Sequence, residues 1–378
     1  MNKRKKIVHI IVGLNNGGAE MMLYKLLKYI DKEKYECSVI SMMDKGVMKE
    51  RIEKLGIPVY CLNMKRGVPS IQAIVKSLRL CKDKDIIQTW MYHANLLGCL
   101  VGKILNKKII WGIHHSNLEK DKNKKSTLII AKINSYLSKW IDNIVSCSNT
   151  AKEIHIKYGY KKEKIVVIPN GFEIEEFNYL DKARNILEKE FLVLKDKIIF
   201  SLVARYDILK DHKTCIEAMK IIKERYNKNF ILLLCGTNIN KNNQELVRMI
   251  EENKLEENIL LLDRRDDIPI IMSATDIYIS SSSGEGFPNV IGEAMACETP
   301  CVVTDVGDSA YIVGNTGKIV DRCNPKQLAE AIIELLTEVN KDFKSKECRK
   351  RIEENFEINN IVKRYEKIYN KILDKKED

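Results

Sequence analysis

The sequence lacks any apolar run near the ~20 residues that a membrane-spanning helix requires. Its most apolar stretch, residues 94–105, already includes Asn95 and Lys103. The apolar run behind the basic N-terminus, Ile7–Val12, is shorter than the apolar region of a secretory signal and has no small-residue cleavage site. We therefore expect a cytoplasmic protein, whose only contact with a membrane is peripheral, on the inner face of the plasma membrane.

Paired cysteines are missing as well. None of the eleven cysteines forms a C-x-x-C pair, and most stand in apolar surroundings, which predicts small core residues in a reducing compartment. The aromatic residues, 7% of the chain, are scattered, and no nucleic-acid-binding module is recognisable. The sequence therefore predicts neither a disulfide framework nor a nucleic-acid partner.

Acidic residues are scarce in one half only. Residues 1–170 hold 32 basic and 14 acidic residues, a net charge of +18, whereas residues 171–378 hold 32 and 38, a net charge of −6. A general bias toward lysine enriches both halves alike and does not explain this asymmetry. The first half is expected to meet an anionic partner. By charge alone, nucleic acid, an anionic membrane surface and a phosphorylated substrate all fit, although the sequence shows no nucleic-acid-binding module.

Apolar runs alternate with amphipathic stretches from Ile7 to residue 168, and again from Ile198 to about residue 355. Strands separated by ~10–15-residue helices predict parallel sheets with helices on both faces. Pro169-Asn170-Gly171 is a strong turn signal between the two series. We expect an α/β fold of two Rossmann-like, doubly wound parallel-sheet domains facing across a cleft. They cover residues 1–180 and 195–356, and a C-terminal helix, residues 357–378, packs back on the first.

Ligands of doubly wound sheets bind beyond the carboxyl ends of the strands, so the loops there are the candidate sites. Gly17 and Gly18 follow the first strand and open a helix, where a phosphate can approach bare backbone N–H groups. Their spacing fits neither the dinucleotide-binding pattern nor a Walker A loop. A plain tight turn explains the two glycines equally well.

Two basic residues, Arg205 and Lys210, stand on the loop after the first strand of the second domain. The planar guanidinium and the mobile ammonium both suit phosphate oxygens. A surface ion pair on a loop is the alternative interpretation.

Two glutamates follow a later strand of the same domain, in Gly284-Glu285-Gly286-Phe287-Pro288 and at Glu293. Pro288 suits a first helical position, which places Glu293 in the second turn of that helix. A carboxylate can accept hydrogen bonds from adjacent hydroxyls of a ribose or hexose. The alternative is a helix-dipole partner and a solvated helix residue.

The chain resembles the retaining glycosyltransferases of family 4, which have the GT-B fold. The resemblance rests on Glu285-Gly286-Phe287-Pro288 followed by Glu293-Ala294-Met295-Ala296, and on Pro300–Gly307 after it. Arg205, Lys210 and His212, the turn Pro169-Asn170-Gly171 and Gly17-Gly18-Ala19-Glu20 also fall in the expected order, so the resemblance covers essentially the whole chain.

The resemblance implies a role for each matching residue. Arg205 and Lys210 neutralise the donor diphosphate, Glu285 contacts the transferred sugar and Glu293 the ribose. His114 matches the family's cleft histidine, with His115 as the neighbouring alternative. The implied catalytic residues are His114, Arg205, Lys210 and Glu285, and the implied donor-binding residues are Gly17, Gly18, Gly236, Gly286, Phe287, Pro288, Asn289, Val290 and Glu293.

An aromatic cluster follows another strand of the first domain and supplies acceptor candidates. Trp90 or Tyr92 can stack on a sugar ring, and His93 and His115 stand close in sequence. A core tryptophan beside a helix cap is the alternative for this cluster.

The sequence lacks a D-x-D pair in a suitable loop, so we expect no metal site and no cofactor, with Arg205, Lys210 and a helix N-terminus offsetting the diphosphate charge. The resemblance implies transfer from a UDP- or GDP-sugar, with retention, to a glycan or a polyprenyl-diphosphate-linked acceptor in surface polysaccharide synthesis. The alternatives are a nucleotide-sugar epimerase on the same fold and a basic nucleic-acid-binding protein without catalysis.

The basic first domain is expected to face the acceptor and an anionic membrane surface. Its basic residues gather in three places: Lys3, Arg4, Lys5 and Lys6; Lys65 and Arg66; and Lys107, Lys108, Lys120, Lys122, Lys124 and Lys125, with Leu118 and Leu128 as apolar neighbours.

Overall fold

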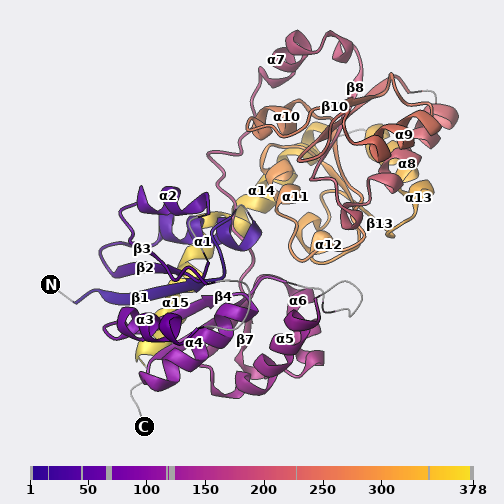
Figure 1. Ribbon diagram of the computed structural model, residues 1–378. Coiled ribbons are helices and arrows are strands. Elements are labelled where there is room, and N and C mark those ends of the chain that lie inside the picture. The colour runs from indigo at the N-terminus through magenta and orange to yellow at the C-terminus, as the bar shows by residue number, and fades with distance from the viewer. Residues whose placement is uncertain are drawn as a thin grey trace. The chain divides into compact units, whose positions relative to one another are not determined.

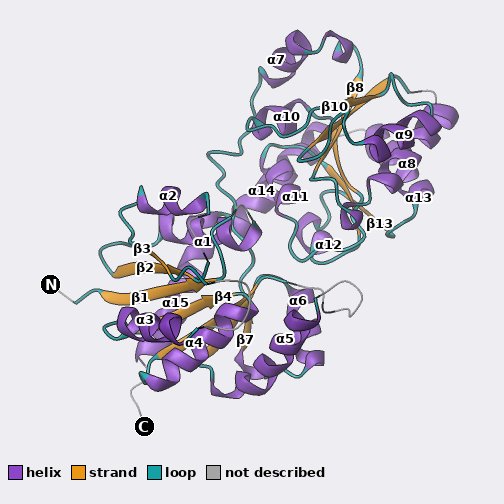
Figure 2. Cartoon of the chain, in the orientation of Figure 1, coloured by secondary structure: helices purple, strands orange, loops and turns teal. Residues whose placement is uncertain are grey.

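The computed structural model describes residues 3–374 apart from 16, 44–45, 65–69, 116–117, 119–123, 227 and 339–340. The chain divides into two compact units, one of residues 1–171 with 358–378 and one of residues 172–357. Each unit holds one sheet in which every strand pair is parallel. Figures 1 and 2 show helices flanking each sheet. The expected α/β fold with two doubly wound sheets is confirmed.

The first unit has seven strands in the order β3-β2-β1-β4-β5-β6-β7. The strands are β1 (Lys5–Ile11), β2 (Tyr35–Ser41), β3 (Val59–Cys61), β4 (Ile86–Trp90), β5 (Lys108–Ile113), β6 (Asn143–Ser146) and β7 (Ile165–Val167). The helices are α1 (Gly18–Tyr29), α2 (Met48–Glu53), α3 (Ile71–Cys81), α4 (Tyr92–Ile104), α5 (Lys125–Leu137), α6 (Asn149–Tyr158) and α15 (Ile358–Asp374). The strand order reverses between β1 and β4, the place where such sheets bind ligands.

The second unit has six strands in the order β10-β9-β8-β11-β12-β13. The strands are β8 (Ile198–Val203), β9 (Phe230–Cys235), β10 (Ile259–Leu261), β11 (Ile277–Ser280), β12 (Cys301–Thr304) and β13 (Lys318–Val320). The helices are α7 (Ala183–Glu190), α8 (His212–Tyr226), α9 (Gln244–Glu252), α10 (Ile268–Ala274), α11 (Asn289–Ala296), α12 (Ser309–Val313), α13 (Pro325–Thr337) and α14 (Lys341–Phe356). Here the order reverses between β8 and β11.

The C-terminal helix α15 completes the core of the first unit. Ile361, Tyr365 and Tyr369 are buried with residues of α1, β1 and β4 in one apolar cluster. The Tyr365 ring lies 6.4 Å from the Trp90 ring, and Lys25 on α1 donates to the Gly171 carbonyl just before the chain leaves this unit. A segment from the far end of the sequence therefore supports the sheet beneath the β4 loop.

The described helices include none that is both long enough and apolar enough to cross a bilayer. Two elements differ from the predicted boundaries in a way that matters for the site. Residues 183–190 lie between the two predicted series of alternating segments and form α7, since Ala183 and Leu187 pack on the second sheet. Pro288, predicted as a first helical residue, is the N-cap of α11, because its ψ of 98° keeps the backbone extended.

Candidate functional site

The loop after β8 is shaped by Asp207. Its carboxylate accepts hydrogen bonds from the Leu209 N–H at 2.9 Å and from Arg205 at 3.0 and 3.2 Å. Burial alone would raise the pKa of Asp207, but these hydrogen bonds and the charges of Arg205 and Lys210 outweigh it and lower that pKa. The Arg205 side chain is 64% exposed, so most of its guanidinium faces solvent. The fixed carboxylate holds Arg205 in place without burying it.

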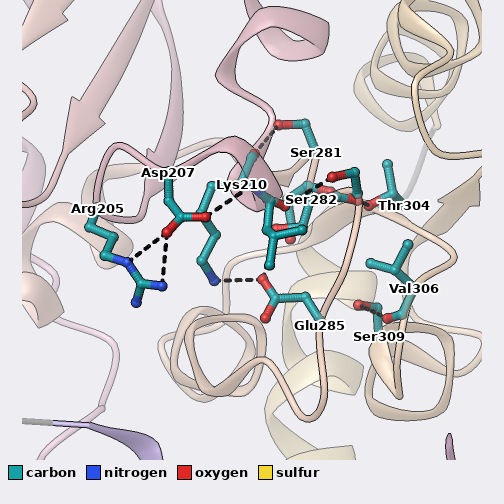
Figure 3. Close-up of polar contacts among 12 residues, drawn as sticks. Arg205, Asp207, Lys210, Ser281, Ser282, Glu285, Thr304, Val306 and Ser309 are labelled. Atoms are coloured by element: carbon teal, nitrogen blue, oxygen red, sulfur yellow. Dashed lines mark hydrogen bonds and ion pairs between the residues drawn. The ribbon is translucent and has the colours of Figure 1, made fainter. Parts of the chain in front are cut away.

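Lys210 at the end of this loop forms an ion pair with Glu285, which follows β11. Lys210 Nζ lies 2.5 Å from Glu285 Oε1, and the two side chains are only 19% and 13% exposed. Ser282 donates a second hydrogen bond to the same carboxylate oxygen at 2.7 Å. Figure 3 shows Lys210 and Glu285 pointing toward each other, with Arg205 extending to the same side of the loop as Lys210. Two cations, Arg205 and Lys210, thus gather at the carboxyl edge of the second sheet, each paired with a carboxylate, Asp207 and Glu285.

Hydroxyl groups fasten the loops that carry this pair. Ser281 Oγ donates to the carbonyls of Lys210 and Asp211 at 3.2 and 2.9 Å, and the Ser283 N–H donates to the Leu209 carbonyl at 2.8 Å. Thr304, at the end of β12, donates to the Ser282 carbonyl at 2.6 Å. None of these hydroxyl residues is among the predicted site residues, although the run Ser281-Ser282-Ser283 directly after a strand was a signal in the sequence.

Gly307, which has a left-handed backbone conformation, packs against the backbone of the loop that carries Glu285. Gly307 has a φ of 59°, and a Cβ built on it lies 2.6 Å from the carbonyl oxygens of Glu285 and Gly286. The next residue, Asp308, donates its N–H to the Gly286 carbonyl at 3.0 Å. Only glycine combines this backbone conformation with so close an approach. The close contact with Gly307 therefore helps to fix the position of the Glu285 backbone at the edge of the second sheet.

Glu293 lies in the second turn of α11 and is half-buried. Burial raises the pKa of the Tyr278 phenol far above its ordinary range, and Cys301, Glu285 and Glu293 add to the rise. Both predicted glutamates thus lie close enough to Tyr278 for their charges to act on it. The structure brings Arg205, Lys210, Glu285 and Glu293 to one edge of one unit.

The other predicted donor-binding residues of this unit divide into two groups. Pro288 and Val290 line a small cavity together with Lys210, Ser282 and Glu285. Asn289 and Gly286 are half-buried beside it, and Gly236 touches the Ala204 backbone, where a Cβ would approach the carbonyl oxygen to 2.1 Å. Phe287 differs, because it is 8% exposed and stacks on Phe172 with ring centroids 6.2 Å apart. Its place is in the core, where it holds the glutamate loop.

In the first unit, the loops after β4 and β5 bring Trp90 and His114 together. The two rings stack with centroids 4.8 Å apart, and Trp90 Nε1 donates to His9 Nδ1 at 3.3 Å. Neither ring nitrogen of His114 has a hydrogen-bond partner among the described residues. Burial lowers the pKa of His114 to about 4. His114 is therefore a neutral imidazole with free hydrogen-bonding capacity.

Of the four acceptor candidates, Trp90 and Tyr92 are core residues. Trp90 has no exposed surface, and Tyr92, 3% exposed, places its hydroxyl 2.8 Å from His155 Nε2. Neither ring offers a free face to a sugar, as the alternative interpretation states. His93 and His115 are half-buried, and burial lowers the pKa of His93.

The glycines after β1 lie at the start of α1. Gly17 is the N-cap, with an extended backbone, and Gly18, the first helical residue, is exposed. A Cβ on Gly17 would lie 2.5 Å from a carboxylate oxygen of Glu20. In the part of the chain that the structure describes, no three His, Cys, Asp or Glu side chains gather as a metal site.

Both units match known families. Residues 16–176 match the family model described as "Glycosyltransferase Family 4", and residues 183–356 match "Glycosyl transferases group 1". The chain is 25% identical over 98% of its length, and 97% of the relative's, to an Escherichia coli UDP-Gal:alpha-D-GlcNAc-diphosphoundecaprenol alpha-1,3-galactosyltransferase. It is 24% identical, over 99% of each chain, to the capsular polysaccharide biosynthesis glycosyltransferase CapM of Staphylococcus aureus.

Solved structures show the same fold. The structure of Anabaena HepE in complex with UDP has a TM-score of 0.85 and 20% identity, and the match covers 97% of this chain and 100% of that one. The enzymes of family 4 are retaining and need no metal ion. With both units matched in order along the sequence, the chain belongs to glycosyltransferase family 4 and is a retaining glycosyltransferase of the GT-B fold.

Proposed function

We propose that this enzyme transfers a sugar from a UDP-linked donor to an undecaprenyl-diphosphate-linked saccharide during synthesis of a surface polysaccharide. The observation that carries the proposal is the pair of cations Arg205 and Lys210 beside Glu285, in a chain that matches, along almost its whole length, a galactosyltransferase whose acceptor is lipid-linked. The match to a structure that holds UDP supports the choice of nucleotide. Family membership favours transfer over both epimerisation and nucleic-acid binding.

In this proposal the second unit binds the donor. UDP leaves with several negative charges on its diphosphate, and Arg205 and Lys210 stabilise that charge as it develops. One oriented donor is typically worth ~3–4 kcal/mol of barrier. Glu293 accepts hydrogen bonds from the ribose hydroxyls, and Glu285 contacts the transferred sugar. Because Glu285 already holds Lys210, it also sets the position of that ammonium toward the diphosphate.

The first unit binds the acceptor side. The anomeric carbon gains positive charge when the bond to UDP breaks, and a protonated histidine nearby would oppose this charge. Burial keeps His114 neutral, so it offers a hydrogen bond without repulsion. The backbone N–H groups of Gly17 and Gly18 at the start of α1 are the donors that we assign to phosphate oxygens on this unit.

We also propose that the basic first unit contacts an anionic membrane surface. Of the residues predicted to do so, Arg4, Lys5, Lys6 and Lys108 form ion pairs with carboxylates in the structure. Lys65, Arg66, Lys120 and Lys122 lie outside the described residues. The structure does describe five other residues that were predicted to lie near the membrane: Lys3, Lys107, Lys124, Lys125 and Leu128. The N-terminal cluster is therefore a weaker candidate for the contact than the region of Lys124 and Lys125.

A donor and acceptor panel tests this function. The purified chain is incubated with UDP-galactose, UDP-glucose, UDP-N-acetylglucosamine, UDP-N-acetylgalactosamine or GDP-mannose. A polyprenyl-diphosphate-linked N-acetylglucosamine or the free sugar is added as acceptor. We expect a mass increase of one sugar on the lipid-linked acceptor from a UDP-sugar, with the donor's α configuration in the product by NMR. Transfer only from GDP-mannose, transfer only to the free sugar, or conversion of a donor without acceptor would contradict the proposal.

A further inference from the structure

Helix α5 presents its apolar side chains to solvent. Ile129, Ile133, Tyr136 and Trp140, the last one just beyond the helix, are 61%, 40%, 68% and 52% exposed. Their spacing of four, three and four residues places them along one side of a helix. We call these four residues the α5 stripe. A helix on a soluble domain normally turns such a stripe toward the core.

The opposite side of α5 explains this orientation. Ala131, Asn134, Ser135 and Ser138 are the buried residues there, and they are small or polar. Asn134 Nδ2 donates to the Tyr92 carbonyl at 2.9 Å, at the start of α4, and Ser138 Oγ accepts from the Lys161 N–H at 3.1 Å. These hydrogen bonds fix the rotation of the helix, so the α5 stripe faces outward.

Lysines flank the stripe, and acidic residues are missing from it. Lys124, Lys125, Lys132 and Lys139 are exposed, and the sequence has no Asp or Glu from residue 124 to residue 141. Lys132 Nζ lies 5.2 Å from the Tyr136 ring centroid, and Lys139 Nζ lies 4.9 Å from that of Trp140. On the neighbouring helix α4, which packs against α5, Leu100 and Ile104 are exposed as well. Figure 1 shows the two helices in the same unit.

From these contacts we propose that the α5 stripe lies in the headgroup layer of an anionic bilayer, with Trp140 and Tyr136 at the polar–apolar boundary and the flanking lysines on lipid phosphates. Aromatic and aliphatic side chains between lysines, without acidic residues, are the pattern of helices that lie in a membrane surface. A protein partner is the weaker fit, because lysine is depleted in protein interfaces. The inference rests on the proposed function, since a lipid-linked acceptor resides at such a surface.

Trp140 makes the inference directly measurable. The chain has three tryptophans, and Trp90 and Trp111 are fully buried, so a change of tryptophan emission on lipid binding reports on Trp140. The full-length protein is mixed with phosphatidylcholine vesicles that contain 0, 20 or 40% phosphatidylglycerol, at low and high salt. We expect a blue shift of emission and quenching by brominated lipid, increasing with phosphatidylglycerol and decreasing with salt. Trp140→Leu removes the spectral change.

Amino-acid substitutions test whether vesicle binding depends on the α5 stripe and its lysines or only on the net positive charge of the protein. Lys132→Glu with Lys139→Glu is expected to weaken vesicle co-sedimentation at least 25-fold, since ~1 kcal/mol per lysine is about fivefold each. Ile133→Ser with Tyr136→Ser is expected to weaken it about tenfold or more. The control, Leu192→Ser with Lys195→Glu, changes one exposed apolar residue and one exposed lysine on the second unit and should leave binding unchanged.

The outcomes distinguish this inference from the proposed function. Transfer to the lipid-linked acceptor in detergent with no vesicle binding would overturn the inference and leave the function standing. Vesicle binding that depends on the stripe, with no transfer to a lipid-linked acceptor, would support the surface and contradict the function. Sedimentation velocity tests whether a second copy of the chain covers the α5 stripe instead of a membrane. If the protein is a dimer and Ile133→Ser with Tyr136→Ser dissociates it, a second copy covers the stripe and the inference is wrong.

Discussion

The indole of Trp90 lies flat against the imidazole of His114, with an angle of 22° between the ring planes, and Tyr365 of the C-terminal helix stacks on the indole too. His114 has no hydrogen bond among the described residues that holds its ring, so this stacking is what orients it. The support of a residue implied in catalysis thus comes from the last helix of the chain.

We expect Trp90→Leu to lower kcat about 10–100-fold, because small displacements of a reacting group have effects of this size. The Michaelis constant for the UDP-sugar should change little. Trp111→Leu is the matched control, since Trp111 is equally buried but packs on Tyr160, away from the His114 ring. Both variants lose stability, so activity is measured well below each melting temperature. Equal losses of kcat in the two variants would contradict the role assigned to Trp90.

The Lys210–Glu285 pair leads to a second prediction. Lys210→Ala and Arg205→Ala should each lower kcat about 10²–10³-fold, since each removes a cation from the developing diphosphate charge. The fold should persist, because Arg205 is 64% exposed and because Ser282 still donates a hydrogen bond to Glu285 once Lys210 is removed. Lys213→Ala, which removes an exposed lysine in the first turn of α8, should leave kcat unchanged. A Lys210→Ala enzyme with more than a tenth of wild-type activity would show that the cation is not needed.

Substitution of Gly307 should affect both the stability of the fold, through backbone strain, and the activity, through the position of Glu285, and the two effects can be measured separately. Gly307→Ala should cost about 1–2 kcal/mol of unfolding free energy for its left-handed backbone, and should also lower activity, because the new methyl group displaces the Glu285 carbonyl. Gly56→Ala is the control, since Gly56 has a φ of 80° with open space around it. Chemical denaturation and initial rates measure the two effects. A Gly56→Ala enzyme that loses as much activity as Gly307→Ala would contradict a local effect on Glu285.

Buried histidines predict instability in mild acid. Burial lowers the pKa of His9 to about 3 and those of His114, His155 and His212 to about 4, whereas unfolded histidine titrates near 6.5. Between these values the unfolded chain binds more protons than the folded one. The free energy of unfolding is therefore highest above pH 6.5 and falls as the pH decreases toward 4, by up to ~1.4 kcal/mol per pH unit for each histidine.

Melting temperatures at pH 7, 6 and 5 measure this decline. His155→Gln should make the dependence on pH shallower by about one proton. A melting temperature that does not change between pH 7 and pH 5 would mean that these histidines are protonated in the folded protein.

The cationic loop also predicts how the enzyme responds to chelators. Arg205 and Lys210 supply the charge that a divalent ion supplies elsewhere, so transfer should proceed at an unchanged rate in EDTA. The rate is compared with and without 10-fold excess chelator over any trace metal, followed by addition of Mg²⁺ or Mn²⁺. Loss of activity that either ion restores would disprove the metal-free mechanism.

Much of this protein follows from the sequence alone. Continuous apolar runs between amphipathic segments determine the two parallel sheets, because a strand buried on both faces needs apolar residues at every position. The spacing from Glu285 to Glu293, with a proline between them, determines that both carboxylates lie around one helix start. These are local properties, and the short-range geometry of the chain is enough to decide them.

Other features were decided only by tertiary packing. Trp90 and Tyr92 have the composition of a sugar-stacking platform, yet α15 and His155, distant in sequence, bury them. The periodicity of α5 predicts an apolar stripe but not the side on which it lies. The hydrogen bond that Asn134 donates to the Tyr92 carbonyl and the one that Ser138 Oγ accepts from the Lys161 N–H turn it outward, and such long-range bonds leave no periodic trace in the sequence. The same holds for Gly307, whose closeness to Glu285 exists only because β11 and β12 lie side by side in the sheet.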